Sequence, residues 1–258
     1  MHRFRVRCID WIRRMDATLI SIGGASRLLG ISIDTLRRWD TSGRLHSVRS
    51  GPKGHRFYQL SEIEQLTQNQ YRRAREWVES PGGFEVSPDV FCHTRDIFQA
   101  RLEKLQAKLS RNFPIEIVSL SIDVAGEIGN NSFDHNLGNW PDITGIFFTY
   151  HTTSKTIILA DRGVGVLATL KRVKPELTTA SDALRVAFTE TISGRMPEAR
   201  GNGLKFVRSV IIHNPFLLYF QTGDAYLYLK KNDRDITIQH ADRIIRGCFA
   251  TIKIEDIV

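Results

Sequence analysis

Apolar residues recur every three or four positions on both sides of Gly30: Ile22, Ala25, Leu28 and Leu29 before it, and Ile33, Leu36 and Trp39 after it. This spacing is typical of two short amphipathic helices. Gly30 suits the position just after a helix, and Ser32 suits the cap of the next one. The pattern predicts two helices joined by a tight turn.

Short extended runs follow at residues 43–49 and 56–58, on either side of a tip rich in Gly, Ser and Pro at residues 50–55. Two such runs around a turn segment predict a β-hairpin. Ser61 then opens a further helix.

The rest of the chain mixes both periodicities. Residues 68–82 are polar and basic and lead into Pro81-Gly82-Gly83, which predicts a linker. Helices are expected at 87–112, with an apolar stripe of Ile97, Leu102, Leu105 and Leu109, at 117–136, and from Gly203 onward. Strands are expected at 143–150, 156–160, 216–222, 225–230 and 248–254. Residues 166–199, of mixed polarity, are expected to form a mobile lid.

The net charge of +8 lies almost entirely at one end of the chain. The first 80 residues hold 15 Lys and Arg against 8 Asp and Glu. This one-sided charge predicts a polyanion partner, most simply nucleic acid, although a solvated basic surface is the plain alternative. Three distant cysteines and the lack of a signal peptide or membrane span indicate a reduced, cytoplasmic protein that neither enters nor crosses a membrane.

Residues 20–67 resemble the MerR-type winged helix-turn-helix in the order and spacing of Leu28-Leu29-Gly30, Thr35 to Trp39, Gly43-Arg44-Leu45 and Gly54 to Tyr58. The outward side of the second helix is expected to read double-stranded DNA in the major groove, and the hairpin to hold phosphates. The candidate DNA-binding residues are Ser32, Asp34, Thr35, Arg37, Arg38, Arg44, Arg49, Lys53, His55, Arg56 and Tyr58. Because such domains usually begin near the initiator, Met15 is a candidate start and residues 1–19 are assigned to a basic extension.

Three polar motifs follow in the near-neutral part of the chain: Glu127-x3-Asn131-x3-His135, Asp161-x-Gly163-x-Gly165, and Gly201-x-Gly203-Leu204. A carboxylate and an amide on one helix face suit Mg²⁺ and a positioned water, or else form a satisfied core network. Glycines at the start of a helix suit a phosphate. Gly163 to Ala168 also fits a dinucleotide-binding fingerprint, but the segment after it is a poor match for a parallel βαβ unit.

In this order the motifs resemble the N, G1 and G2 boxes of the GHKL ATPase superfamily, across residues 95–258. Together with the MerR-type resemblance, this one implies an α+β protein, with a winged helix-turn-helix, a linker at 68–94 and a Bergerat-type α/β sandwich that takes ATP and Mg²⁺. Glu127 would orient the attacking group, Asn131 would bind Mg²⁺, and Asp161 would accept from the adenine amino group. Gly163 and Gly165 would hinge the lid, Gly201, Gly203 and Leu204 would cradle phosphates, and Thr251 would reach the adenine through water.

The sequence therefore predicts a DNA-binding, ATP-responsive regulator. The alternatives are an anti-sigma-type serine/threonine kinase that acts on a STAS-like partner, and a DNA-associated ATPase of mobile-element or defence systems. MerR-type proteins bind paired half-sites, so a homodimer is expected, and the stripe at residues 97–109 is the candidate seam.

Overall fold

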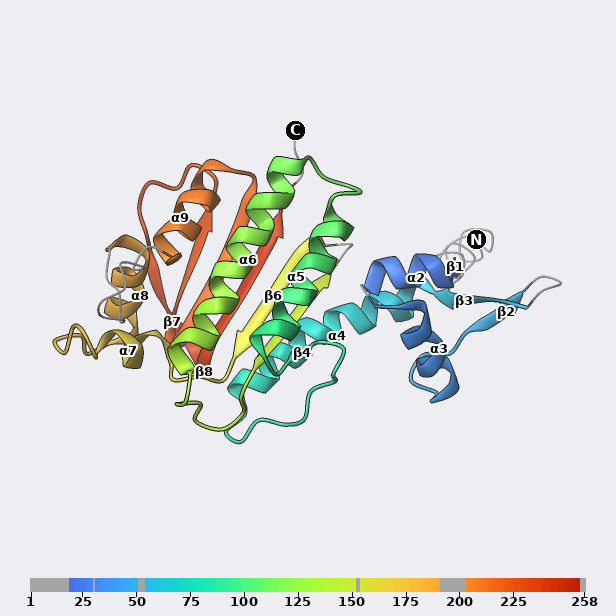
Figure 1. The fold of residues 1–258 in the computed structure, drawn as a ribbon, viewed down its shortest axis with the longest axis horizontal. Helices are drawn as coiled ribbons and strands as arrows, with labels where there is room; N and C mark the ends of the chain where they lie inside the picture. The colour runs from blue at the N-terminus through green and yellow to red at the C-terminus, as the bar shows by residue number, and fades with distance from the viewer. Residues whose placement is uncertain (1–18, 30, 51–53, 152–153, 191–202, 256–258) are drawn as a thin grey trace, which may run out of the picture. The chain divides into compact units, whose positions relative to one another are not determined.

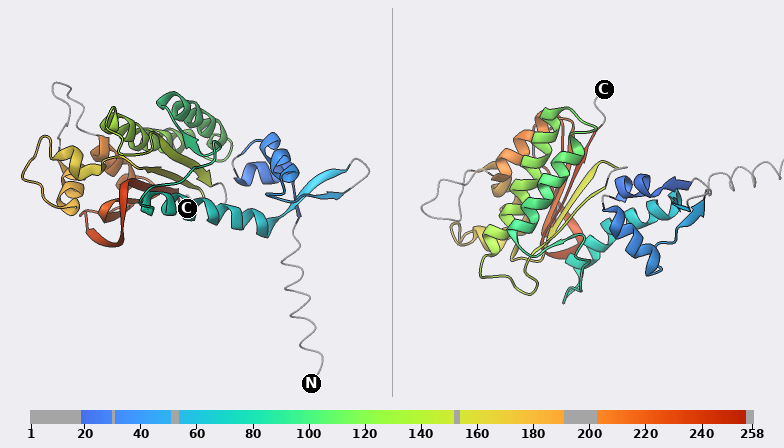
Figure 2. Two further views of the ribbon diagram at one scale, coloured as in Figure 1. Left: turned by 90° about the horizontal axis from the view of Figure 1, so that it is seen from below. Right: turned by 45° about the vertical axis from the view of Figure 1, so that its right-hand side comes forward.

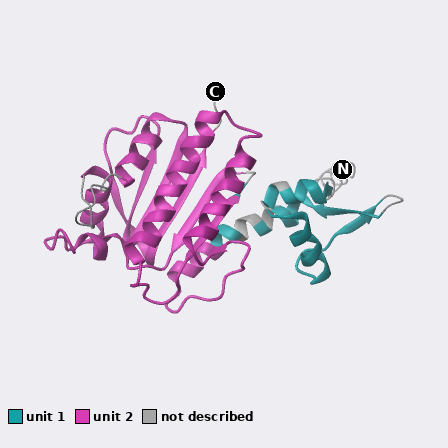
Figure 3. Ribbon diagram, viewed as in Figure 1, with its two compact units in different colours: residues 1–72, 151–153 teal, residues 73–150, 154–258 magenta. Residues whose placement is uncertain are grey.

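The computed structural model describes residues 19–29, 31–50, 54–151, 154–190 and 203–255. The chain divides into two compact units (Figure 3). Unit 1 holds residues 1–72 with 151–153, and unit 2 holds residues 73–150 with 154–258. The boundary lies inside the helix α4 (Leu60–Glu79), although the sequence predicted a linker over residues 68–94. A run without Gly or Pro lets this segment continue as a helix until Ser80.

Unit 1 has the predicted helix-turn-helix and hairpin. It contains β1 (Leu19–Ser21), α2 (Ile22–Leu29), α3 (Ile33–Thr41), β2 (Val48–Ser50), β3 (His55–Gln59) and the start of α4. The three strands form an antiparallel sheet in the order β1-β3-β2. One apolar cluster holds it together: Ala25, Leu29, Leu36, Trp39, Leu45, Tyr58 and Ile63.

Unit 2 is a sheet of five strands in the order β4-β5-β6-β8-β7. The strands are β4 (Phe91–Cys92), β5 (Ile146–His151), β6 (Thr156–Asp161), β7 (Phe216–Lys230) and β8 (Ile238–Ile254). The helices are α5 (Arg95–Leu109), α6 (Ile115–Asn136), α7 (Gly165–Leu170), α8 (Ala180–Thr189) and α9 (Gly203–His213). Helices α5, α6 and α9 cover one face of the sheet (Figures 1 and 2).

The other face of this sheet packs against the end of α4. Ala74, Trp77 and Val78 join Phe147 and Phe249 in a second apolar cluster. The sheet therefore has a helical layer on one side and part of α4 on the other. Strand β8 pairs antiparallel with both β6 and β7, whereas a dinucleotide-binding fold would place a parallel strand beside β6.

Helix α5 begins later than predicted, at Arg95, because the Thr94 side chain caps it by accepting from the backbone N–H of Ile97. The buried stripe is Phe98, Leu102, Leu105 and Leu109, whereas Ile97 is 39% exposed. This stripe lies in the main core of unit 2 against α6. Because these four side chains are buried within unit 2, they are not available to form the predicted dimer seam.

The predicted lid region contains two helices. Helix α7 spans Gly165–Leu170 and α8 spans Ala180–Thr189, and Leu170, Leu177, Ala183 and Val186 form a small apolar cluster between them. Residues 191–202, which include Gly201, lie outside the described residues. Across the part of the chain that is described, no helix is both long and apolar enough to span a membrane.

Candidate functional site

The first candidate surface is the exposed side of α3. Ser32 caps the helix, and its hydroxyl accepts from the Thr35 backbone N–H at 3.0 Å. Asp34, Arg37 and Arg38 are exposed as predicted, and Arg37 pairs with Asp34 at 2.8 Å. This ion pair orients one guanidinium along the outer face of the helix.

Two predicted DNA-binding residues are buried and do not lie on that surface. Thr35 is 4% exposed, and its hydroxyl lies 2.9 Å from that of Ser32. Tyr58 is fully buried, and its hydroxyl donates to the carbonyl oxygen of Leu36. Ile33, predicted to point inward, is instead 38% exposed. Thr35 is turned inward where its hydroxyl meets that of the exposed cap residue Ser32, which apolar spacing does not reveal.

Asp40 joins α3 to the hairpin. Its carboxylate accepts from Arg56 Nε at 2.7 Å and from the backbone N–H and hydroxyl of Ser47 at 2.9 and 2.8 Å. The hydrogen bond from Arg56, with those from Ser47, outweighs the effect of burial and lowers the pKa of Asp40 to about 2. Arg56 therefore fixes the hairpin to α3, a structural task for a residue that the sequence assigned to DNA contact.

The remaining basic candidates lie near the hairpin. Arg49 and His55 are exposed on β2 and β3. Arg44 lies over the Trp39 ring at 3.9 Å. Lys53 lies outside the described residues. The exposed guanidiniums of α3 and β2 give this unit a surface with the charge and donors to bind phosphates and base edges.

The second candidate site is a cavity of about 270 Å³ in unit 2. It is bounded by residues from α6, from the segment after β6, and from the start of α9. Its wall comprises Arg95, Glu127, Ile128, Asn130, Asn131, Ser132, Asp134, His135, Asn136, Asp161, Gly165, Val166, Thr169, Leu170, Ala187, Gly203, Leu204, Phe220 and Cys248. Described residues from each of the three predicted motifs thus line one cavity.

Glu127 and Asn131 lie one turn apart on α6. The Asn131 amide nitrogen donates to Glu127 Oε1 at 3.4 Å. Glu127 also lies directly against the backbone of Gly203, where an added Cβ would overlap the carboxylate. Any other residue at position 203 would force this carboxylate to shift from its place at the start of α9.

Asp161 ends β6 and is 2% exposed. Its Oδ2 accepts from the Ser132 hydroxyl at 2.7 Å, and its Oδ1 accepts from the Gly163 backbone N–H at 2.8 Å. Burial raises the pKa of Asp161 despite these bonds. A carboxyl at the wall of a cavity that has lost contact with water is a strong acceptor for an N–H group of a ligand.

The loop after Asp161 is held by residues that the sequence did not single out. Asn136 Oδ1 accepts from the Val164 backbone N–H at 2.8 Å, and its amide nitrogen donates to the Ser132 carbonyl oxygen at 2.7 Å. Gly163 lies so close to the Asn136 amide that a Cβ would overlap it. Gly165 has a φ of +78° beside the Thr222 hydroxyl, so it meets a backbone requirement that favours glycine.

The structure does not place Thr251 at the cavity. Thr251 pairs with Ile158 and Tyr219, which lie with the second apolar cluster on the other face of the sheet. Cys248, three residues earlier, lines the cavity instead. Strand alternation places these residues on opposite faces, and the sequence pattern alone does not decide which face carries the site.

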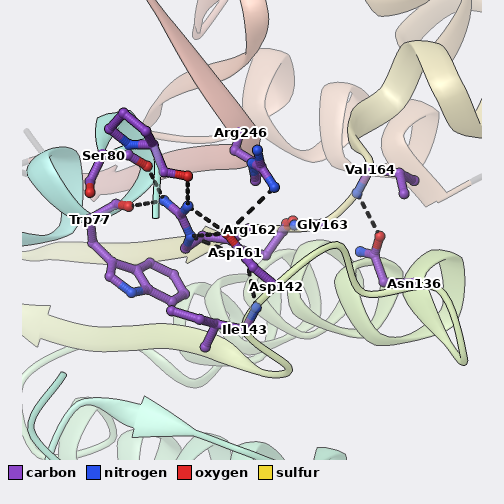
Figure 4. A network of polar contacts seen from close by, with 11 residues as sticks. Trp77, Ser80, Asn136, Asp142, Ile143, Asp161, Arg162, Gly163, Val164 and Arg246 are labelled. Atoms are coloured by element: carbon purple, nitrogen blue, oxygen red, sulfur yellow. Dashed lines mark hydrogen bonds and ion pairs between the residues drawn. The ribbon is translucent and has the colours of Figure 1, made fainter. Parts of the chain in front are cut away.

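A buried arginine lies next to the cavity. Arg162 is fully buried and donates to the carbonyl oxygens of Trp77, Ser80 and Pro81 and to Asp142 (Figure 4). It ties the segment at the end of α4 to the loop that follows β6. No sequence pattern indicated this network, because its partners are mostly backbone oxygens.

One comparison with known proteins concerns the N-terminal part. Residues 21–58 match the family of MerR family regulatory proteins. The chain therefore carries a MerR-like helix-turn-helix DNA-binding domain, and the described surface of α3 and the hairpin belongs to it.

One curated relative is the type II methyltransferase M.Eco47II of Escherichia coli, which is 32% identical over 83 residues. The aligned segment is 32% of this chain and 19% of the methyltransferase. The chain thus spans about a fifth of the length of this relative.

Proposed function

We propose that this chain is a DNA-binding, ATP-responsive regulator, in which unit 2 binds ATP with Mg²⁺ through a GHKL-type site. One observation carries the proposal. Glu127 and Asn131 on α6, Asp161 at the end of β6, and Gly203 at the start of α9 surround a single cavity, although they come from three distant segments of the sequence. Its volume is close to the lower limit of about 300 Å³ for small-molecule sites.

Each part of the cavity suits one part of the ligand. The buried Asp161 carboxyl would accept from the adenine amino group, since it is already held by Ser132 and the Gly163 backbone. The amides at the start of α9 would bind phosphates. Glycine at position 203 leaves room for the Glu127 carboxylate beside that backbone. Gly163 and Gly165 would shape the loop over the base, while Gly201 lies outside the described residues.

The residues present fit Mg²⁺. The Asn131 amide nitrogen donates to Glu127, so its carbonyl oxygen is the atom of that amide suited to a hard cation. Bound between Asn131 and the phosphates, Mg²⁺ would offset their charge. Glu127 would orient a water or a hydroxyl group against the terminal phosphate.

Nucleotide selectivity tests the proposal. Calorimetric titration of the full chain with Mg-ATP should give saturable binding. Mg-GTP should bind at least about tenfold more weakly, because its carbonyl oxygen would face the Asp161 acceptor instead of an amino group. The variant Asp161→Asn should lose ATP affinity. The control Asp123→Asn, on an exposed position of α6 away from the cavity, should not. Equal binding of ATP and GTP would contradict the role of Asp161.

The position of Glu127 in the cavity wall also favours two enzymatic alternatives, a kinase and an ATPase. The destination of the terminal phosphate distinguishes them. With γ-labelled ATP, release of free phosphate identifies an ATPase, and label on a serine of a STAS-like partner identifies a kinase. Glu127→Gln should keep ATP binding and lose either activity. DNA binding as a homodimer on paired half-sites is part of the same proposal, and a gel-shift titration with and without ATP measures whether the nucleotide changes it.

A further inference from the structure

Arg95 is the first residue of α5 and lines the unit 2 cavity. Among the described residues of the cavity wall, Glu127, Asp134 and Asp161 supply carboxylates, and Arg95 alone supplies a lysine or arginine charge. A triphosphate brings several negative charges to a wall that already carries three carboxylates. The cavity therefore needs a cation near the ligand, and Arg95 is positioned to supply one.

Two contacts fix the position of this guanidinium. Thr94 caps α5, so Arg95 begins the helix at a defined place. The Arg95 Nη2 atom donates to Asp134 Oδ1 on α6. Asp134 lies three residues after Asn131, on the same side of α6, and both line the cavity. Arg95 is thus held beside the amide that is proposed to carry Mg²⁺.

An arginine side chain can retain its hydrogen bond to Asp134 while it binds a second anion. A guanidinium carries five N–H donors in a planar fork, and the bond to Asp134 uses one of its terminal nitrogens. Such a fork matches the spacing of phosphate oxygens. We infer that Arg95 binds the phosphates of the nucleotide and makes the site favour nucleotides over the nucleoside. This inference rests on the proposed ATP site.

A purely structural role for the pair is a weaker explanation. The Arg95 side chain is 48% exposed and that of Asp134 is 25% exposed. Ion pairs of this exposure contribute little to stability. Replacing Arg95 should therefore leave the fold intact, and its effect on ligands can be measured in the full chain.

The test compares ATP, ADP and adenosine as ligands of the wild type, Arg95→Gln, Arg95→Lys and the control Lys104→Gln. Lys104 is an exposed lysine on the same helix and does not line the cavity. Arg95→Gln should weaken ATP and ADP by about 10- to 100-fold, the loss of one hydrogen bond to a charged group, and leave adenosine unchanged. Arg95→Lys should recover part of the loss, and Lys104→Gln should match the wild type.

The outcomes separate this inference from the proposed function. If the wild type binds ATP and Arg95→Gln binds it equally well, the inference is wrong and the ATP site stands. The inference also fails if Arg95→Gln weakens adenosine as much as ATP, because the residue then acts through the fold. If the wild type binds none of the three ligands, the proposed function fails and this inference with it.

Discussion

Replacing Arg162 by alanine should strongly destabilise unit 2. The side chain is fully buried and donates to the carbonyl oxygens of Trp77, Ser80 and Pro81 as well as to Asp142. Breaking a buried ion pair from one side costs about 3–5 kcal/mol. Each buried acceptor left without a donor adds about 1–3 kcal/mol, but these contributions do not sum, because water enters the space. We expect the free energy of unfolding to fall by about 3–5 kcal/mol.

Urea unfolding, monitored by hydrogen exchange of the β6 and β8 amides, measures the loss in the free energy of unfolding of unit 2 alone. Arg172→Ala is the matched control, because Arg172 is exposed and should change stability by less than about 0.5 kcal/mol. Arg162→Lys should not restore the wild type, since one ammonium cannot reproduce the fork. If the free energy of unfolding falls by less than about 1 kcal/mol in Arg162→Ala, the Arg162 network does not stabilise unit 2 as proposed.

The same network has a pH dependence. Burial of Asp142 acts to raise its pKa. The hydrogen bonds from Arg162 and the Ile143 backbone, with the charges of Arg162 and Arg246, outweigh burial and hold the pKa below the ordinary 3.8. A carboxyl with a lowered pKa stabilises the folded state above pH 3.8 and loses that contribution as the pH falls through its folded value. The stability difference between the wild type and Arg162→Ala should therefore narrow below about pH 4.

Three further predictions concern the two sites. Gly203→Ala should weaken ATP binding by about tenfold or more, and calorimetry measures this. The added Cβ would overlap the Glu127 carboxylate beside the amides that are proposed to bind phosphates, so the methyl group or the displaced carboxylate would crowd the phosphates. Unchanged affinity would show that the phosphates do not lie against the start of α9. Arg56→Gln should lower the melting temperature of unit 1 at pH 7 but not near pH 2. The pKa of Asp40 is lowered to about 2, so the stabilisation from this carboxylate is lost as the pH falls from 3.8 to that value. An equal change in melting temperature at both pH values would contradict the pairing of Arg56 with Asp40. Arg49→Ala should weaken DNA binding uniformly across sequences and lower the salt slope by about 1 in a gel-shift titration, and a sequence-dependent loss would instead assign it to base contact.

The sequence predicted the order of the elements well where one face of an element is buried. Helix α6 begins within two residues of its expected start at 117 and ends at the expected Asn136, because its apolar positions follow the helical period throughout. The hairpin of unit 1 was found from its Gly-rich tip. The start of α5 was misplaced, because the Thr94 cap is a local polar signal that the apolar pattern of 87–112 concealed.

Side-chain direction was harder to predict than element type. Thr35 and Tyr58 have polar groups and stand in motifs that face DNA, yet both are buried and bonded within unit 1. Thr251 and Cys248 lie three residues apart on β8, and only the register with β6 decides which of them meets the cavity.

The residues that support the cavity were not visible in the sequence at all. Asn136 and Arg162 act mainly on backbone groups, and any sequence position can supply a carbonyl or an N–H. Gly247, with a φ of +71°, packs directly against Asp161 from a distant strand. Such contacts depend on the sheet order β6-β8-β7, which local patterns do not determine.

The proposal that unit 2 binds ATP is tested most directly by calorimetric titration of the wild-type chain with Mg-ATP, with Mg-GTP as the reference ligand. We expect one saturable site per chain that prefers ATP and is lost in Asp161→Asn. No heat of binding up to millimolar ATP, with the chain folded and bound to DNA in a parallel gel-shift assay, would contradict it.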